Sequence, residues 1–169
     1  NDEMLSIHGS KRGWQLLKSK IKPKKRKPMR CYEKRADKLI QIGYVDYLSY
    51  LQSEEWLTIR NRKLRRYPDC LLCQEQRATQ VHHMSYDCAT LLGQKDHRLV
   101  QLCRTCHTRI ELKGDGSKRH LKDANRMLFK FAESTERGRS WIIWMENQDL
   151  LFKRRERLRK RCEKKERAK

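Results

Sequence analysis

The chain has 169 residues, of which 37% are hydrophobic and 37% are charged, and its formal net charge is +21. This length suits one domain with extensions, and the small apolar fraction excludes a single core that fills the whole chain. No apolar run approaches the ~20 residues that a membrane-spanning helix needs. No signal peptide is visible either, so we expect an intracellular protein of the cytoplasm or nucleoid with no membrane partner.

The positive charge is concentrated at the two ends of the chain. Residues 1–35 carry 12 Lys or Arg against 3 acidic residues, and residues 116–169 carry 18 against 8, whereas the segment between them is nearly neutral. Because Lys and Arg release condensed counterions from phosphates, this distribution favours a nucleic acid as partner. A solubilising or ribosome-associated tail would have a similar composition.

We therefore divide the chain into three regions. Residues 1–35 are predicted to form a basic, extended arm, because the charge run that contains Lys24, Lys25 and Arg26 is interrupted by prolines. Residues 36–115 are predicted to be the folded domain, with helices at its N-terminal side. Residues 116–169 are predicted to be a helical, strongly basic extension.

Two helices are expected at the start of the folded domain, over about 44–51 and 54–66. Their apolar residues recur at roughly helical spacing, and Ser53-Glu54-Glu55 is typical of a helix start with acidic residues in the first turn. Pro68 ends the second helix.

The centre of the domain has short elements. Residues 78–84 and 99–102 are predicted to be strands, and a helix is predicted from Thr105 onward, ending before Gly114-Asp115-Gly116. Residues 120–132 form an amphipathic pattern, and a further helix over 141–166 becomes almost wholly charged beyond Phe152. Trp141 and Trp144 in this helix are interpreted as core residues.

The cysteines predict a structural zinc site. Cys70 and Cys73 form one C-x-x-C pair, and Cys103 and Cys106 form another. Two such pairs supply the four thiolates of a tetrahedral zinc site, which is closed and therefore stabilises the fold without taking part in chemistry. The other cysteines have no partner at suitable spacing and are expected to be free thiols: Cys31, Cys88 and Cys162.

Histidines beside the cysteine pairs predict a second, open metal site. His82 and His83 are adjacent on a predicted strand and therefore point to opposite faces. His107 follows Cys106, and Glu111 lies one helical turn later on the same face. These side chains offer nitrogen and oxygen ligands suited to a divalent ion, although single histidines are often only packing residues.

Together these motifs resemble the HNH endonuclease family, over about residues 44–112. The resemblance rests on the following residues: Tyr47–Tyr50, Ser53-Glu54-Glu55-Trp56, Cys70-x-x-Cys73, Ala78-x-x-Val81-His82-His83-x-x-Tyr86, Leu92-Gly93 and Leu99-Val100-x-Leu102-Cys103-x-x-Cys106-His107. The resemblance implies a small α+β fold with a ββα-metal module. This module is stabilised by the four-cysteine zinc site and flanked by helices and basic arms.

The resemblance also implies catalytic roles. His83 matches the general base that takes a proton from the attacking water. His82 and His107 match ligands of the catalytic metal, and Glu111 stands where some members place a further ligand histidine. The implied activity is one-metal hydrolysis of phosphodiester bonds in DNA, with Mg²⁺ or Mn²⁺ as the catalytic ion.

One position departs from the family pattern. The middle Asn of the HNH name falls at Arg98, which would repel a metal and could instead bind a phosphate. Arg104 and Arg109 beside His107, and Arg154 and Arg155 in the basic C-terminal helix, are further candidate phosphate contacts, or else exposed helix charges. With Lys24, Lys25 and Arg26 they complete the predicted nucleic-acid-binding set.

Two other functions fit the same sequence. The chain is also compatible with a non-catalytic, zinc-stabilised module that binds nucleic acid, for example within a ribonucleoprotein. It is further compatible with an interaction protein whose basic C-terminal helix docks an acidic partner.

Overall fold

The computed structural model describes residues 31–167. The predicted contacts Lys24, Lys25 and Arg26 lie outside the described residues. Helix α2 (Cys31–Gln41) starts within the range that was predicted to be an extended arm, so its described part is helical. No helix in the described part of the chain combines the length and apolar character of a membrane span.

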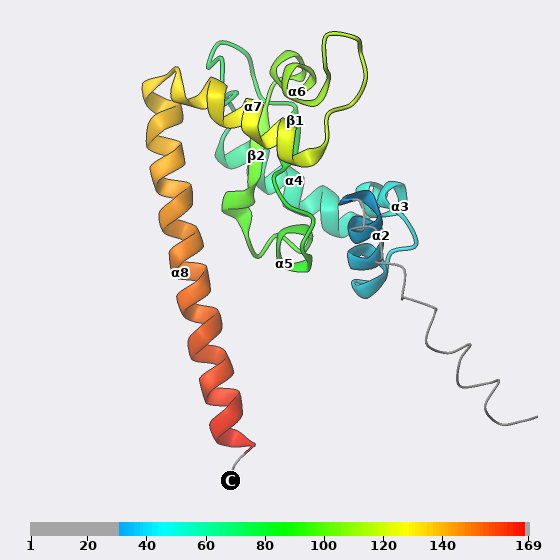
Figure 1. Cartoon of the computed structure of the whole chain (residues 1–169), viewed down its shortest axis with the longest axis vertical. Helices are drawn as coiled ribbons and strands as arrows, with labels where there is room; N and C mark the ends of the chain where they lie inside the picture. Colours follow the sequence, from blue (N-terminus) through cyan, green and yellow to red (C-terminus); the bar gives the residue numbers. More distant parts are fainter. Residues whose placement is uncertain (1–30, 168–169) are drawn as a thin grey trace, which may run out of the picture.

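The described elements make a small, mostly helical α+β fold with one two-stranded sheet (Figure 1). After α2 they follow in the order α3 (Tyr47–Gln52), α4 (Glu54–Arg66), β1 (Gln80–His83), α5 (Cys88–Leu91), the 3-10 turn η1 (Asp96–Arg98), β2 (Leu99–Leu102), α6 (Arg104–Glu111), α7 (Leu121–Glu133) and α8 (Glu136–Glu166). The predicted helix over 54–66 and strand over 99–102 have these bounds, whereas the strand predicted over 78–84 is shorter.

The sheet separates the two histidines of β1. The strands are antiparallel, with His82 opposite Val100 and His83 opposite Leu99. Because residues alternate between faces along a strand, His82 and His83 enter different halves of the interior. The expectation that they point to opposite faces is therefore confirmed.

Each face of the sheet has its own hydrophobic cluster. On the side of Val100, the cysteine pairs pack with buried residues of α6, α7 and α8, including Ile110, Leu128 and Met145. On the side of Leu99, helices α2 to α4 supply Leu39, Tyr50, Trp56 and Ile59. Helix α7 thus shares a core with the cysteine pairs.

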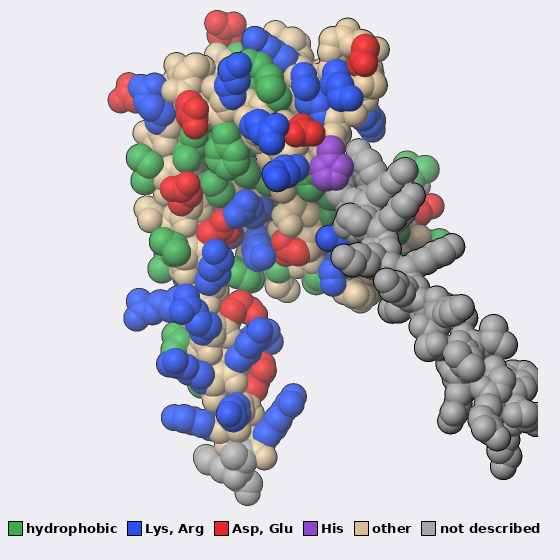
Figure 2. Space-filling model, viewed as in Figure 1, with side chains coloured by type: hydrophobic (Ala, Val, Ile, Leu, Met, Phe, Trp, Pro, Cys, Tyr) green, Lys and Arg blue, Asp and Glu red, His purple; other side chains and the backbone are tan. Residues whose placement is uncertain are grey.

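Helix α8 turns sharply away from α7 and then extends beyond the body of the molecule (Figure 1). The turn requires glycine, because a Cβ at Gly138 would lie 2.0 Å from the Ala132 carbonyl oxygen. The helix starts at Glu136, earlier than the predicted 141. Trp141 is partly buried against Phe129, whereas Trp144 is 37% exposed. Figure 2 shows Lys and Arg side chains gathered along the projecting half of α8.

Candidate metal centres and the pocket around them

The four predicted zinc ligands come together. Their Sγ atoms all lie within 4.8 Å of one another, and those of Cys73 and Cys103 are 3.8 Å apart. Tetrahedral zinc with Zn–S bonds of about 2.3 Å places sulfurs roughly 3.8 Å apart. The cluster therefore has the size that a zinc ion needs.

Local structure explains how the cysteine pairs are formed. After Cys73 the chain turns through Gln74, whose φ of 60° lies in the left-handed region. Cys103 is the N-cap of α6, and its Sγ accepts a hydrogen bond from the Cys106 backbone N–H. Burial works to raise the pKa of the Cys73 thiol, but backbone hydrogen bonds from Gln76 and Glu75 outweigh it and lower this pKa to about 7. This thiol is therefore close to its thiolate form at neutral pH.

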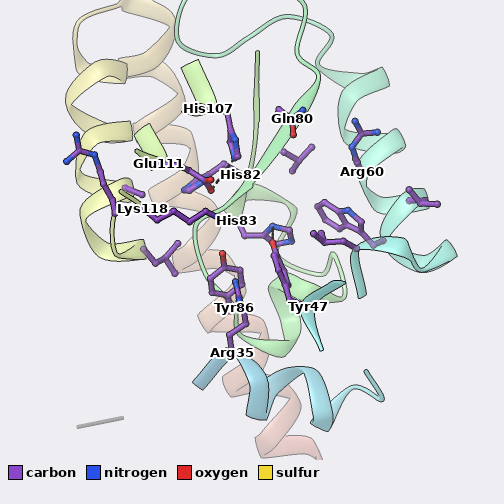
Figure 3. A pocket seen from close by; sticks show the side chains of 17 residues that line it. Arg35, Tyr47, Arg60, Gln80, His82, His83, Tyr86, His107, Glu111 and Lys118 are labelled. Atoms are coloured by element: carbon purple, nitrogen blue, oxygen red, sulfur yellow. Dashed lines mark hydrogen bonds and ion pairs between the residues drawn. The ribbon is translucent and has the colours of Figure 1, made fainter. Parts of the chain in front are cut away.

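A second cluster joins β1 to α6. The ligand atoms of His82, His107 and Glu111 lie within 4.8 Å of one another, and Figure 3 shows the three side chains converging. Glu111 Oε1 is 3.7 Å from His82 Nδ1 and 3.4 Å from His107 Nε2. Three ligands leave coordination positions open, in contrast to the four-cysteine cluster. Among the described residues, these two clusters are the ones that could hold a metal ion.

The ionisation states in the second cluster suit metal binding. The hydrogen bond with His82 is the main cause that lowers the pKa of Glu111, although burial opposes it. Burial lowers the pKa of His107. A carboxylate and neutral imidazoles are the forms that coordinate metal ions.

Asn125 of α7 determines which nitrogen of His82 faces the cluster. Asn125 Nδ2 donates to the Met84 carbonyl oxygen at 2.8 Å, so the amide oxygen must face His82 Nε2, which lies 3.0 Å away. Since this oxygen only accepts, Nε2 carries a proton. Nδ1, the nitrogen nearest Glu111, therefore faces the cluster.

His83 is enclosed by aromatic side chains on the other side of the sheet. The hydroxyl of Tyr50 donates to the Leu91 carbonyl at 2.9 Å, so it accepts from His83 Nε2 at 3.3 Å. The remaining His83 nitrogen, Nδ1, then accepts from the Tyr47 hydroxyl at 3.3 Å. The Trp56 ring lies 4.5 Å away between centroids. Burial is the main cause that lowers the pKa of His83 to about 3.

Both histidine environments open into one cavity of about 390 Å³. Its lining includes His82, His83, His107 and Glu111, together with four cationic side chains: Arg35, Arg60, Lys118 and Arg119. In Figure 3, Arg60 and Lys118 lie on opposite sides of the labelled histidines, and Arg35 lies below them beside Tyr86. The metal-ligand cluster therefore lies in a pocket with cations around its edge.

These four cations and Asn125 were not among the site residues predicted from the sequence. Arg35 was placed in the N-terminal arm, Arg60 in a predicted helix, and Lys118, Arg119 and Asn125 in the C-terminal extension. Their positions at the cavity depend on how α2, α4 and α7 pack, for which the local sequence carries no signal. Tyr47 was part of the quoted motif, without a role.

Arg98 has a different environment from the one predicted. Its Nε lies 3.1 Å from Asp149 Oδ1, its Nη2 also binds that carboxylate, and His97 Nε2 is 2.7 Å from the same oxygen. These contacts fasten η1 to α8, and Arg98 does not line the cavity. We therefore interpret Arg98 as a structural ion-pair partner, and its contact with a phosphate stays a prediction.

The other predicted phosphate contacts are solvent-exposed. Arg104 and Arg109 are exposed on α6 but do not line the cavity, and the Arg109 guanidinium lies 4.1 Å from the centre of the Phe131 ring. Arg154 and Arg155 are exposed on the projecting half of α8. All four are accessible to a polyanion, at a distance from the cavity lining.

Comparisons with family models, with curated proteins and with solved structures find no match to this chain. Membership of the HNH family therefore stays a prediction from the sequence motifs.

Proposed function

We propose that this protein is a metal-dependent endonuclease of the HNH type that hydrolyses phosphodiester bonds in DNA. The observation that carries the proposal is the open cluster of His82, His107 and Glu111, which opens into the same cationic cavity as the neutral His83. In this proposal β1, β2 and α6 form the ββα-metal module, and the four cysteines bind structural zinc.

A second metal site is hard to explain as a device for stability alone. The four-cysteine cluster already joins the segment after α4 to the start of α6. The His82, His107 and Glu111 cluster keeps two imidazoles and a carboxylate beside the cavity, at the cost of burying polar groups: the pKa of His107 is lowered by burial, and that of Glu111 is lowered although burial opposes it. A buried pocket with perturbed ionisable groups is typical of a reaction site.

The three ligands would hold Mg²⁺ or Mn²⁺, which supplies positive charge to polarise the phosphate and stabilise the leaving oxygen. The cationic edge of the cavity attracts the DNA backbone. His83 accepts the proton of the attacking water at Nδ1, after the water displaces the Tyr47 hydroxyl from that nitrogen.

The low pKa of His83 has two consequences for this role. A pKa of about 3 keeps the imidazole neutral at physiological pH, so its lone pair is always available. It also makes His83 a weak base. Water entering the cavity would raise the pKa because it weakens the desolvation, and a phosphate anion would raise it because its negative charge stabilises the imidazolium.

The proposal is tested by incubating supercoiled plasmid with the full chain and Mg²⁺ or Mn²⁺, beside a His83→Ala variant. We expect the wild type to convert supercoiled plasmid to nicked or linear forms, and the variant to be slower by about 10²–10⁴-fold. Equal rates for wild type and variant would overturn the assigned base, and the absence of metal-dependent cleavage would overturn the nuclease.

A second candidate function is a non-catalytic, zinc-stabilised module that binds nucleic acid, for example within a ribonucleoprotein. It is favoured by the hydrogen bonds that occupy both ring nitrogens of His83. Such a module would bind the plasmid and leave it intact in the same assay.

A further inference from the structure

The loop between α6 and α7 brings two cationic residues to the metal-ligand cluster. Leu112 and Lys118 form an antiparallel bridge, and the Arg119 backbone N–H donates to the Glu111 carbonyl at 2.7 Å. The tip of the loop is held by a bond from the Lys113 N–H to the Ser117 carbonyl at 2.9 Å. The loop therefore doubles back and places Lys118 and Arg119 directly beside the ligand Glu111.

Arg119 has a buried donor with no partner. Its Nε is shielded from solvent and makes no hydrogen bond within the described part of the chain, although the side chain lines the cavity. An unsatisfied buried donor costs about 1–3 kcal/mol, and more when the group is charged. At such a site a water, an ion or a ligand supplies the missing acceptor.

Lys118 lies on the same side of the cavity. Figure 3 shows its side chain next to Glu111 and His82, and it lines the cavity with them. The antiparallel bridge between Leu112 and Lys118 holds the backbone of Lys118 next to the end of the helix that carries Glu111.

The charges in this corner favour an anionic ligand. Lys118 and Arg119 bring two positive charges to the part of the cavity lining where Glu111 supplies one negative charge. The excess positive charge attracts an anion. Arg guanidinium and Lys ammonium groups are the usual protein partners of phosphate.

We propose that Lys118 and Arg119 form a phosphate-binding subsite that holds the DNA backbone beside the metal cluster. The choice of DNA as the source of the phosphate rests on the proposed function. The guanidinium of Arg119 donates its orphaned Nε–H to a backbone phosphate oxygen, and Lys118 neutralises the charge of the same group. Arg60, on the other side of the cavity, is placed to contact the next part of the strand.

The test measures binding rather than cleavage. Full-length zinc-loaded protein, without added Mg²⁺ or Mn²⁺, is titrated onto a fluorescein-labelled DNA duplex at salt concentrations between about 50 and 200 mM. Wild type is compared with Lys118→Gln/Arg119→Gln. The matched control is Lys122→Gln/Lys130→Gln, which removes the same charge from exposed positions on neighbouring α7 that do not line the cavity.

We expect the Lys118/Arg119 variant to bind at least about tenfold more weakly, and the slope of log K against log salt to fall by about 2. The control should keep both values near those of wild type. An unchanged slope in the first variant, or an equal loss in the control, would overturn the subsite. Arg119→Lys keeps the charge but not the fork of donors, and it should restore the slope with only part of the affinity.

Two further measurements make the result specific. Binding of Mn²⁺ alone should persist in the Lys118/Arg119 variant, which would show that the cluster is folded. Loss of Mn²⁺ binding would overturn the interpretation of weakened DNA binding.

In the second measurement, inorganic phosphate is added to the complex of wild type and DNA at constant ionic strength. If it displaces all the DNA from wild type at low millimolar concentration, the subsite serves free phosphate and the backbone assignment is overturned. If DNA binding passes these tests and no plasmid is cut, the proposed nuclease fails while the subsite stands.

Discussion

His82 Nε2 and Asn125 Oδ1 lie 3.0 Å apart, and this contact links α7 to the metal-ligand cluster. The Met84 carbonyl fixes the orientation of the Asn125 amide, so Nε2 of His82 carries a proton and Nδ1 faces Glu111. Partners of this kind orient imidazoles that bind metal ions and raise their basicity. A side chain from the C-terminal part of the chain therefore orients one residue of the candidate metal site formed by β1 and α6.

Asn125→Leu is predicted to weaken Mn²⁺ binding. The leucine cannot accept from Nε2–H, so the ring loses the contact that keeps Nδ1 directed at Glu111. Loss of the hydrogen-bond partner of a metal-binding histidine costs about 10–100-fold in metal affinity. Isothermal titration with Mn²⁺ measures the effect on the zinc-loaded protein.

Asn125→Asp is the control for this prediction, because its carboxylate still accepts from Nε2–H. We expect it to retain more of the Mn²⁺ affinity than Asn125→Leu, even though it cannot donate to the Met84 carbonyl. If both variants bind Mn²⁺ as tightly as wild type, Asn125 does not position His82.

The four-cysteine cluster predicts one tightly held zinc ion per chain. Cys70→Ser should lose the zinc and the cooperative unfolding transition, because metal binding to such sites is coupled to folding. Metal analysis and thermal unfolding measure the two effects. Cys88→Ser and Cys162→Ser, which change thiols outside both clusters, should keep the metal and the transition. Full zinc occupancy in Cys70→Ser would contradict the assignment.

The low pKa of His83 predicts that the free energy of unfolding depends on pH. Its native pKa of about 3 lies below the value of about 6.5 in the unfolded chain, so the unfolded chain binds the proton first as the pH falls. The contribution of neutral His83 is therefore complete above pH ~6.5 and is lost progressively toward pH ~3. Chemical unfolding between about pH 7.5 and 5.5 should show a drop in the free energy of unfolding that is about 1 kcal/mol larger for wild type than for His83→Phe. An equal drop in both proteins would show that His83 titrates normally.

The ion pair between Asp149 and Arg98 is predicted to stabilise the packing of α8 against η1. Asp149→Asn leaves the partly buried guanidinium of Arg98 without its charged partner, and we expect a loss of roughly 1–3 kcal/mol in the free energy of unfolding. Asp123→Asn breaks an exposed ion pair with Arg126 and should cost only about 0–1 kcal/mol. Metal binding should be unchanged in both variants. A loss for Asp149→Asn no larger than that for Asp123→Asn would show that the contact is weak.

Local sequence patterns predicted the elements that carry the ligands. Each pattern lies within one local element. The C-x-x-C spacing belongs to a metal-binding turn, His82 and His83 are adjacent on a strand, and His107 and Glu111 are four residues apart on a helix. Short-range geometry determines these features, so they can be predicted without knowing the tertiary fold.

The features that the sequence did not reveal depend on contacts between distant segments. Asn125 contacts His82 across 43 residues, and Arg98 binds Asp149 across 51. Arg35 reaches the cavity because the end of the predicted arm belongs to helix α2. No spacing rule connects such distant pairs. The sequence therefore does not distinguish Arg98, which pairs with Asp149, from Arg119, whose Nε has no partner among the described residues.

The most direct test of the proposed nuclease compares the Mn²⁺ dependence of plasmid cleavage with Mn²⁺ binding, in wild type and in His107→Ala, with zinc occupancy matched. We predict that wild-type cleavage half-saturates at the Mn²⁺ concentration that half-fills the cluster. His107→Ala should shift both values to higher concentration together, because the variant removes a proposed ligand. Cleavage by His107→Ala with wild-type rate and wild-type Mn²⁺ dependence would contradict the proposed nuclease.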